Sequence, residues 1–437
     1  MTSSAENELL IHVEPAGMRM LRLTVEVAEA RVQQEMQRAA RRIARSANIP
    51  GFRKGKAPYE VIASRFGEEA IRREAADEMV GDVYRQALKA NEITPYDTGV
   101  LEGSELSPLR FVFLVPLPPV VDLGNYRSLR LKPPRVQVAK KEVEQRLEQL
   151  RREAAVLEPA EGRAAEWGDV VVVAIEGRNE QGEILLHEEE AEILLEAEDG
   201  DQVSDIAIAQ QIVGMKSDEE RTFKLDPPAD AAPVATEFTV RVLEVFDRIL
   251  PKIDDDLART VGSYRGLKEL EADLKDSLRE VKQKEADDQY ADDVLRKVVE
   301  QAKVEYPPIM LEEMIDRLVE QLENRLRREQ RMALSDYLKI IGRSEEDLRQ
   351  DLQPQAEERL RYSLVLSEVA DVEGIQVSDE EVEEKIESIS RFWREQTDAV
   401  RERLRGEDSR EMMVNELLVK KTVDCLVAIA RGDAEQN

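Results

Sequence analysis

The first 115 residues switch between two hydrophobic periods. Apolar and polar side chains alternate over residues 18–27, which predicts a half-buried β-strand, and residues 109–115 predict a second one. Between these strands the period becomes helical over residues 28–47, 59–66 and 68–90. Residues 1–115 are therefore expected to form an α/β domain whose core lies between the strands and the helices.

The middle of the chain has a different pattern. Residues 116–159 predict an extended, proline-rich linker followed by a short charged helix near residues 140–157. Residues 160–247 contain a β-branched run at 170–175, a turn at 179–182, short strands at 184–186 and 193–195, and an alternating strand at 237–245. This stretch predicts a small β-rich domain.

From residue 248 to residue 437 the pattern is helical. Leu267, Leu270 and Leu274 are spaced three and four residues apart, and Pro307-Pro308 separates this helix from the next, at residues 309–332. Further helices are expected at 334–341, 345–371, 379–392 and 410–430. Ser344 and Ser378, each followed three residues later by an acid, predict capping boxes. The fold class is thus multidomain α+β, with an all-helical C-terminal domain.

Composition excludes several classes of protein. The net charge of −30 argues against a nucleic-acid coat, unless a local basic patch reverses the sign. The single cysteine, Cys425, excludes a disulfide framework, and the two histidines, His12 and His187, lie too far apart to suggest a metal site. We expect no cofactor and no metal. The N-terminus lacks a secretory signal and no apolar run is long enough for a membrane span, so a cytoplasmic protein is expected.

One segment is strongly basic although the chain as a whole is acidic. Residues 31–58 carry eight cations and one acid, Glu35, and they include the loop Ile-Pro-Gly-Phe-Arg-Lys-Gly-Lys-Ala-Pro at 49–58. Cations on a glycine-flanked loop can approach phosphates, and an aromatic side chain between them can enter a pocket or stack. This predicts RNA or a ribonucleoprotein as the partner. The contact residues would be Gly51, Phe52, Arg53, Lys54, Gly55 and Lys56. A nucleotide-binding loop fits poorly, because three residues separate the glycines and no Ser or Thr follows Lys56.

This loop resembles the ribosome-docking signature of trigger factor, the ribosome-associated chaperone family of bacteria. Phe52, Arg53 and Lys54 match the contact residues of that signature one for one, and the resemblance extends over the whole chain. It implies a ribosome-binding domain at 1–115 that docks on the large ribosomal subunit near the exit tunnel. It also implies shielding of nascent and unfolded polypeptides by the domain at 248–437, without ATP, and a homodimer off the ribosome.

The resemblance further implies that residues 160–247 form a peptidyl-prolyl isomerase domain with an FK506-binding-protein-like barrel. The corresponding pocket would be lined by Ala174, Ile175, Ile206, Ile212 and Phe223. The family's pocket aromatics are missing at 174–175, 207–211 and 229–234. Because a dry aromatic cradle favours the twisted amide, we expect a structural barrel with weak or lost isomerase activity.

The capture of unfolded chains needs exposed apolar surface with a charged rim. Methionine adapts to varied partners, so Met310, Met314 and Met332 are candidate client contacts. The principal alternative is an RNA-binding or ribosome-assembly module without chaperone activity. A periplasmic chaperone-isomerase would need an export signal, and an acidic coiled-coil scaffold would need sustained heptads. Neither feature is found in the sequence.

Overall fold

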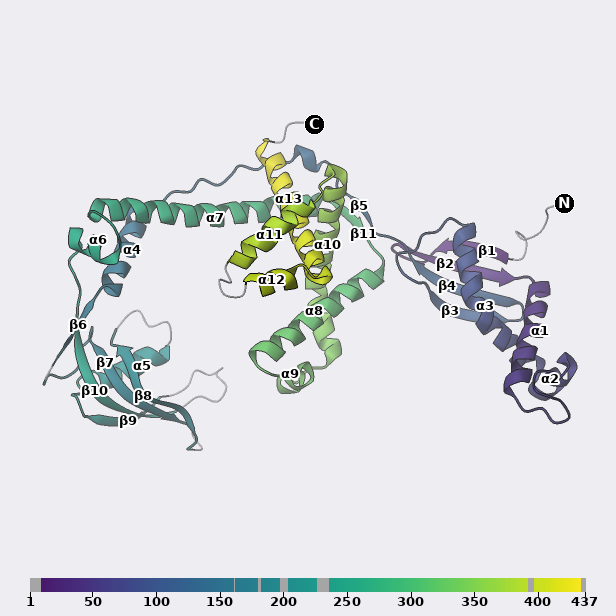
Figure 1. Ribbon diagram of the computed structural model, residues 1–437, viewed down its shortest axis with the longest axis horizontal. Coiled ribbons are helices and arrows are strands. Elements are labelled where there is room, and N and C mark those ends of the chain that lie inside the picture. Colours follow the sequence, from purple (N-terminus) through teal and green to yellow (C-terminus); the bar gives the residue numbers. More distant parts are fainter. Residues whose placement is uncertain are drawn as a thin grey trace. The chain divides into compact units, whose positions relative to one another are not determined.

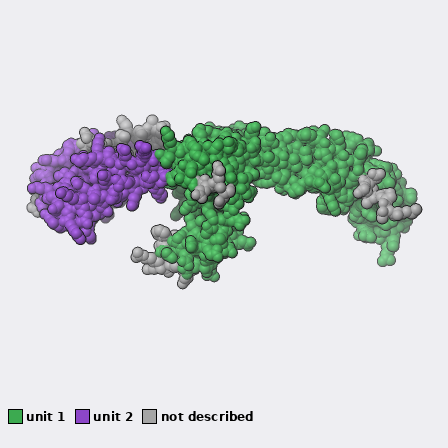
Figure 2. All heavy atoms as spheres, turned by 90° about the horizontal axis from the view of Figure 1, so that it is seen from above, with its two compact units in different colours: residues 1–133, 288–437 green, residues 134–287 purple. Residues whose placement is uncertain are grey.

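The computed structural model of the protein describes residues 9–160, 162–179, 182–196, 203–225, 236–391 and 397–433. The chain divides into two compact units, which Figure 2 shows in green and purple. The first unit contains residues 1–133 and 288–437, and the second contains residues 134–287.

The N-terminal part of the first unit is built on a four-stranded antiparallel sheet (Figure 1). Its order is β1-β2-β4-β3, with β1 at Leu9–Pro15, β2 at Met20–Val27, β3 at Val100–Leu106 and β4 at Leu109–Pro116. The central strands β2 and β4 agree with the sequence prediction. The edge strands β1 and β3 were not predicted. Gly103 interrupts β3, whereas β1 does alternate, with Leu9, Ile11 and Val13 turned to the core, and was overlooked.

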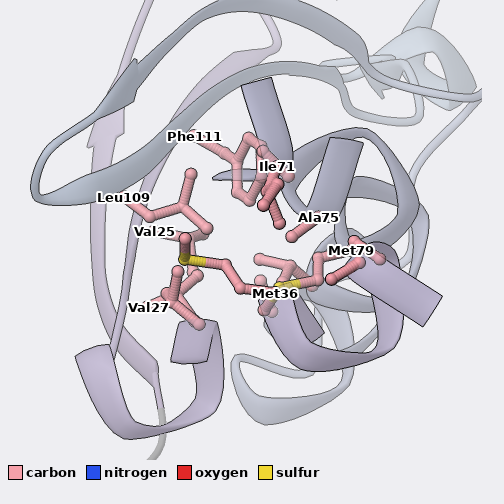
Figure 3. Packing of buried hydrophobic residues seen from close by; sticks show 14 of the residues in the cluster. Val25, Val27, Met36, Ile71, Ala75, Met79, Leu109 and Phe111 are labelled. Carbon is pink, nitrogen blue, oxygen red and sulfur yellow. The ribbon is translucent and has the colours of Figure 1, made fainter. Parts of the chain in front are cut away.

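Three helices complete this domain: α1 (Glu29–Ser46), α2 (Tyr59–Phe66) and α3 (Glu68–Ala90). Helix α3 lies against the strands, and α1 and α2 pack on α3 and on each other. Alternate residues of β2, among them Val25 and Val27, are buried against Met36 of α1 and against Ile71 and Met79 of α3 (Figure 3). Every member of this core cluster lies between Leu9 and Val115. The domain therefore has a hydrophobic core of its own.

Residues 116–138 are not the plain linker that the sequence predicts. β5 (Val120–Asp122) pairs with β11 (Lys303–Glu305), and the short 3-10 helix η1 (Tyr126–Ser128) follows. Leu123 and Tyr126 are buried in an apolar cluster with residues of the helical region. The apolar side chains that alternate with cations here were hidden from prediction by the prolines and charges around them.

The helical region of the chain consists mainly of long helices. They are α7 (Leu267–Gln301), α8 (Pro308–Glu329), α9 (Leu334–Ile341), α10 (Glu345–Glu373), α11 (Asp379–Arg391), α12 (Thr397–Leu404) and α13 (Glu407–Arg431). Both capping boxes are confirmed: the N–H of Asp347 donates to Ser344 Oγ, and that of Glu381 donates to Ser378 Oγ. Among the described helices, none combines the length and apolar character that a bilayer crossing requires.

The second unit contains a five-stranded sheet and the elements around it. These are α4 (Lys140–Glu153), β6 (Val156–Pro159), β7 (Val170–Arg178), β8 (Ile184–Leu194), α5 (Val203–Ile212), β9 (Glu220–Lys224), β10 (Glu237–Ile249) and α6 (Asp255–Val261). The sheet order is β6-β10-β7-β8, and β9 also pairs with β10. One face of β7 and β10 packs on α5 to form the core of this sheet domain.

The structure corrects the sequence prediction of the sheet domain in three places. The predicted strands at 184–186 and 193–195 are one strand, β8, whose exposed glutamates 188–190 obscured its continuity. The helix predicted at 140–157 ends at Glu153, and the next residues form β6, which pairs with the end of β10. Helix α5 was not predicted.

Candidate functional site

The basic loop is held by its backbone. It leaves α1 at Ser46 and enters α2 at Tyr59. Within it the N–H of Phe52 donates to the carbonyl of Ile49 at 3.1 Å, and that of Lys56 donates to Arg53 at 2.9 Å. The N–H of Gly55 donates to the carbonyl of Ala44 in α1 at 2.7 Å. The loop is therefore two successive turns tied to the end of α1, and the buried side chain of Ile49 anchors its first residues.

Two glycines make these turns possible. Gly51 has φ +85° and Gly55 has φ +75°, in the left-handed region that side chains with a Cβ rarely adopt. Gly55 also lies against the side chain of Arg45, since a Cβ at this position would come within 3.0 Å of Arg45 Cγ. The loop thus packs on the aliphatic part of an arginine from α1.

The tip of the loop presents an aromatic ring among cations. Phe52 is 41% exposed, and Arg53, Lys54 and Lys56 are exposed. No ion pair of the described residues involves any of these three cations. The structure therefore brings together all six residues that the sequence singled out.

The acid of this segment is already paired inside α1. Both Arg38 and Arg42 lie 3.0 Å from carboxylate oxygens of Glu35. Arg41 and Arg45 of the same helix are exposed, and neither has an ion pair among the described residues. Sequence reasoning counts Arg45 among the local cations, but only the contact with Gly55 shows that it belongs to the loop.

The residues predicted for the isomerase pocket do not form an aromatic cradle. Ile175 and Ile212 are buried core residues, and the ring of Phe223 stacks on that of Phe238 with centroids 6.0 Å apart. Ala174 is half-buried, one step along β7 from Ile175, and strand alternation turns it to the other face of the sheet. The side chain of Ile206 lies outside the described residues.

A small hollow of about 230 Å³ is found beside Ala174 and Ile175. The rest of its lining is mostly polar, and it consists of Glu176, His187, Glu188, Glu189, Glu220, Thr239 and Arg241. The described lining contains no aromatic side chain apart from the imidazole. It offers charge to a ligand, but no dry apolar surface for a proline ring.

Comparison with known proteins identifies the family. The family model described as "Bacterial trigger factor protein (TF)" matches residues 11–150, and that for the trigger factor C-terminus matches residues 266–428. The trigger factor of Pelotomaculum thermopropionicum is 32% identical over 94% of both chains. The chain belongs to the trigger factor family. The trigger factor of Halothermothrix orenii is 30% identical over 94% of this chain and 97% of its own length.

A solved structure supports the same assignment. It is described as "Promiscuous Substrate Recognition in Folding and Assembly Activities of the Trigger Factor Chaperone". It matches this chain with a TM-score of 0.62 and 27% identity, over 95% of this chain and 99% of the other. The trigger factor family is a family of chaperones, so the fold and the family together place this chain among them.

In this trigger factor the three candidate client methionines are at least half-buried. Met310 is 9% exposed, and Met314 packs beside Ile315 in the contact between α8 and α10. Met332 is half-buried. Helix packing therefore takes up much of the surface of these side chains. Among the described residues of α7–α13, the exposed large apolar side chains are others: Val281, Ile340, Ile341, Val372, Met412 and Val419.

Proposed function

We propose that this trigger factor is an ATP-independent chaperone that docks on the large ribosomal subunit near the exit tunnel and shields nascent polypeptides. The observation that carries the proposal is the loop at 49–58. In a chain of net charge −30, its backbone holds an exposed ring and three cations without ion-pair partners among the described residues. Such a surface fits ribosomal RNA and its proteins, and docking there would place the chain in the cytoplasm.

The helical region is the proposed surface for clients. Ile340 is 71% exposed and Met412 is 72% exposed, whereas charged residues cover most of the neighbouring helix surface. Exposed apolar side chains set among charged residues support weak, reversible contacts with unfolded segments, and the charges limit self-precipitation. Met310, Met314 and Met332 remain candidates only where a client displaces the packing around them.

The docking proposal is tested with a triple variant of the loop, Phe52→Ala, Arg53→Ala and Lys54→Ala. We expect ribosome co-sedimentation to fall at least tenfold. Suppression of aggregation without ribosomes should be unchanged, because the helical region is not altered. The thermal unfolding temperature should also stay the same, since all three side chains are exposed.

A matched control comes from the same domain. Phe66 is 39% exposed, and the Arg65 guanidinium lies 6.0 Å from its ring centroid. The variant Arg65→Ala, Phe66→Ala and Arg73→Ala removes one exposed ring and two cations, as the loop variant does. It should co-sediment like the wild type. An equal loss of binding in both variants would contradict docking through the loop.

We also propose that the sheet domain is a spacer and auxiliary client surface, with weak isomerase activity at most. The buried Phe238, stacked on Phe223, and the polar hollow beside Ala174 support this reading. The cis-to-trans conversion of an Xaa-Pro peptide should be close to the uncatalysed rate in the presence of the full chain. Strong catalysis would show that a pocket without aromatic side chains suffices.

A further inference from the structure

A second stretch of the chain has no acidic residue. Between Asp122 and Glu142 the sequence carries six cations and no acid: Arg127, Arg130, Lys132, Arg135, Lys140 and Lys141. The chain has 93 acids, so a run of this length without an acid is unusual. Its local charge is positive in an acidic chain, as that of the loop at 49–58 is. None of the structural roles described above requires so many cations.

The first two cations of the run have structural partners. Arg127 binds Glu373 with two hydrogen bonds of 2.9 Å, and Arg130 donates to the carbonyls of Arg127 and Leu129. The remaining four, Lys132, Arg135, Lys140 and Lys141, are exposed. Only Lys140 has an ion pair among the described residues, with Glu144, and its side chain is 91% exposed. Such surface pairs contribute little.

We call residues 132–141 the basic strap. Just before the strap the Tyr290 hydroxyl donates to the carbonyl of Leu131 at 2.9 Å, and at its other end the N–H of Ala139 donates to Glu142 in the first turn of α4 at 2.9 Å. Between Lys132 and Val138 the described structure contains no hydrogen bond to another residue. Pro133-Pro134 favours an extended polyproline conformation, which spaces Lys132 and Arg135 about 9 Å apart. The strap therefore carries Lys132 and Arg135 on a stretch whose described backbone is unpaired as far as Val138, and Lys140 and Lys141 in the first turn of α4.

We propose that the basic strap is a second binding site, for the phosphate backbone of single-stranded RNA. The cations can neutralise successive phosphates, and residues 132–141 contain no aromatic side chain to stack on bases, so binding would be independent of sequence. An anionic membrane fits less well, because the strap has no aromatic or leucine side chain to insert and its two valines, Val136 and Val138, are half-buried. At physiological salt the screening length is about 8 Å, so the distant acids of the chain repel a phosphate only weakly.

The choice of RNA over other polyanions rests on the proposed docking at the ribosome, but the site itself does not involve the loop. The test therefore uses both sites. A fluorescent oligouridine is titrated with the full chain, and its anisotropy is followed over a range of salt concentrations. The strap variant is Lys132→Glu, Arg135→Glu and Lys141→Glu, made in the wild type and in the loop variant.

A charge-matched control separates the strap from the total charge. Lys268→Glu, Lys275→Glu and Arg328→Glu change the net charge equally, at exposed positions of α7 and α8 without ion pairs among the described residues. We expect the strap variant to lose roughly tenfold or more in affinity, and the slope of log K against log salt to fall by about 2. The charge-matched control should lose much less affinity for oligouridine. The charge-preserving variant Lys132→Arg and Lys141→Arg should bind like the wild type.

Three outcomes would overturn the proposal. The first is an equal loss of affinity in the strap variant and its control, which would assign binding to total charge. The second is a complete loss of oligouridine binding in the loop variant, together with unchanged binding when only the strap is substituted. The third is equally strong competition by polyglutamate at equal charge, which would make the strap an unselective site for polyanions. Failure of the docking proposal would be seen in a different experiment, because the loop variant would then co-sediment with ribosomes as the wild type does. It can therefore be told apart from failure of the strap proposal.

Discussion

At the scale of single residues, glycine determines what the docking loop can present. Gly51 and Gly55 have similar positive φ angles, but their surroundings differ. A Cβ at Gly51 would meet nothing within 4 Å, whereas a Cβ at Gly55 would press on Arg45 Cγ. A substitution at Gly51 therefore tests backbone strain alone, whereas one at Gly55 tests strain together with displacement of Arg45.

We expect Gly51→Ala and Gly55→Ala each to destabilise the N-terminal domain by about 1 kcal/mol or more, because alanine is strained at positive φ. Only Gly55→Ala should also shift Arg45 and so weaken ribosome binding further. Arg45→Met keeps most of the aliphatic stem and removes the charge, so it should lower ribosome affinity without changing stability. Thermal unfolding of the three variants measures the change in stability, and their co-sedimentation with ribosomes measures the change in ribosome affinity. Equal affinities for Gly51→Ala and Gly55→Ala would remove Arg45 from the site.

A second residue-scale prediction concerns Asp169 at the start of the sheet domain. Its carboxylate is buried and lies 2.5 and 2.6 Å from the two terminal nitrogens of Arg163. Burial raises the pKa of Asp169, but the hydrogen bonds from Arg163 and from the N–H of Glu166 outweigh it and lower the pKa below its ordinary value. The contribution to stability is then full above the unfolded-state pKa of about 3.9, and is lost as the pH falls through the lower folded-state pKa.

Asp169→Asn should therefore destabilise the sheet domain at pH 7 by about 1–3 kcal/mol, because Arg163 loses its charged partner. The difference from the wild type should shrink as the pH falls below about 4. Amide hydrogen exchange of peptides from β7 and β10 reports on this domain within the full chain. A difference that stays constant down to the lowest pH would contradict the assigned role.

At the scale of elements, the sequence predicts what its local pattern encodes. The regular helices and the buried strands β2, β4 and β7 were predictable, because one face of each is apolar. Strands β3 and β8 were missed or split, because glycine in β3 and glutamates in β8 leave these edge strands without a clear apolar face. Strand β1 was missed although Leu9, Ile11 and Val13 alternate along it. The loop residues were evident from charge and glycine, whereas the Gly55–Arg45 contact depends on three-dimensional packing.

The clearest case of such non-local structure is η1. Tyr126 lies in a proline-rich, basic segment, but its ring is buried in the apolar cluster of the helical region and its hydroxyl donates to Glu373. We expect Tyr126→Ala to destabilise the helical region by about 3–5 kcal/mol, as for other buried aromatic residues. Val120→Ala, a few residues earlier and 47% exposed, is the control and should change stability by less than about 0.5 kcal/mol. Urea unfolding followed by hydrogen exchange of α10 and α13 would distinguish a cluster residue from a linker residue.

At the scale of the whole molecule, separate cores allow the functions to be separated. The N-terminal core is complete between Leu9 and Val115, whereas Val121, Leu123, Tyr126, Leu129 and Leu131 belong to the apolar cluster of the helical region. A truncation that removes residues 251–437 would expose Leu123, Tyr126 and their neighbours. A cut at Pro116 leaves the N-terminal core intact and exposes none of these side chains.

The fragment 1–116 therefore discriminates between a chaperone and a pure RNA-binding module. We expect it to fold cooperatively and to co-sediment with ribosomes within a few-fold of the full chain, because it keeps the whole loop and Arg45. It should not suppress the aggregation of unfolded proteins, since it lacks the exposed apolar positions of α9 and α13. The same fragment with the loop triple variant is the control for specific docking. Full suppression of aggregation by the fragment alone would move the client surface out of the helical region, and would leave the large acidic half of the chain without the role proposed here.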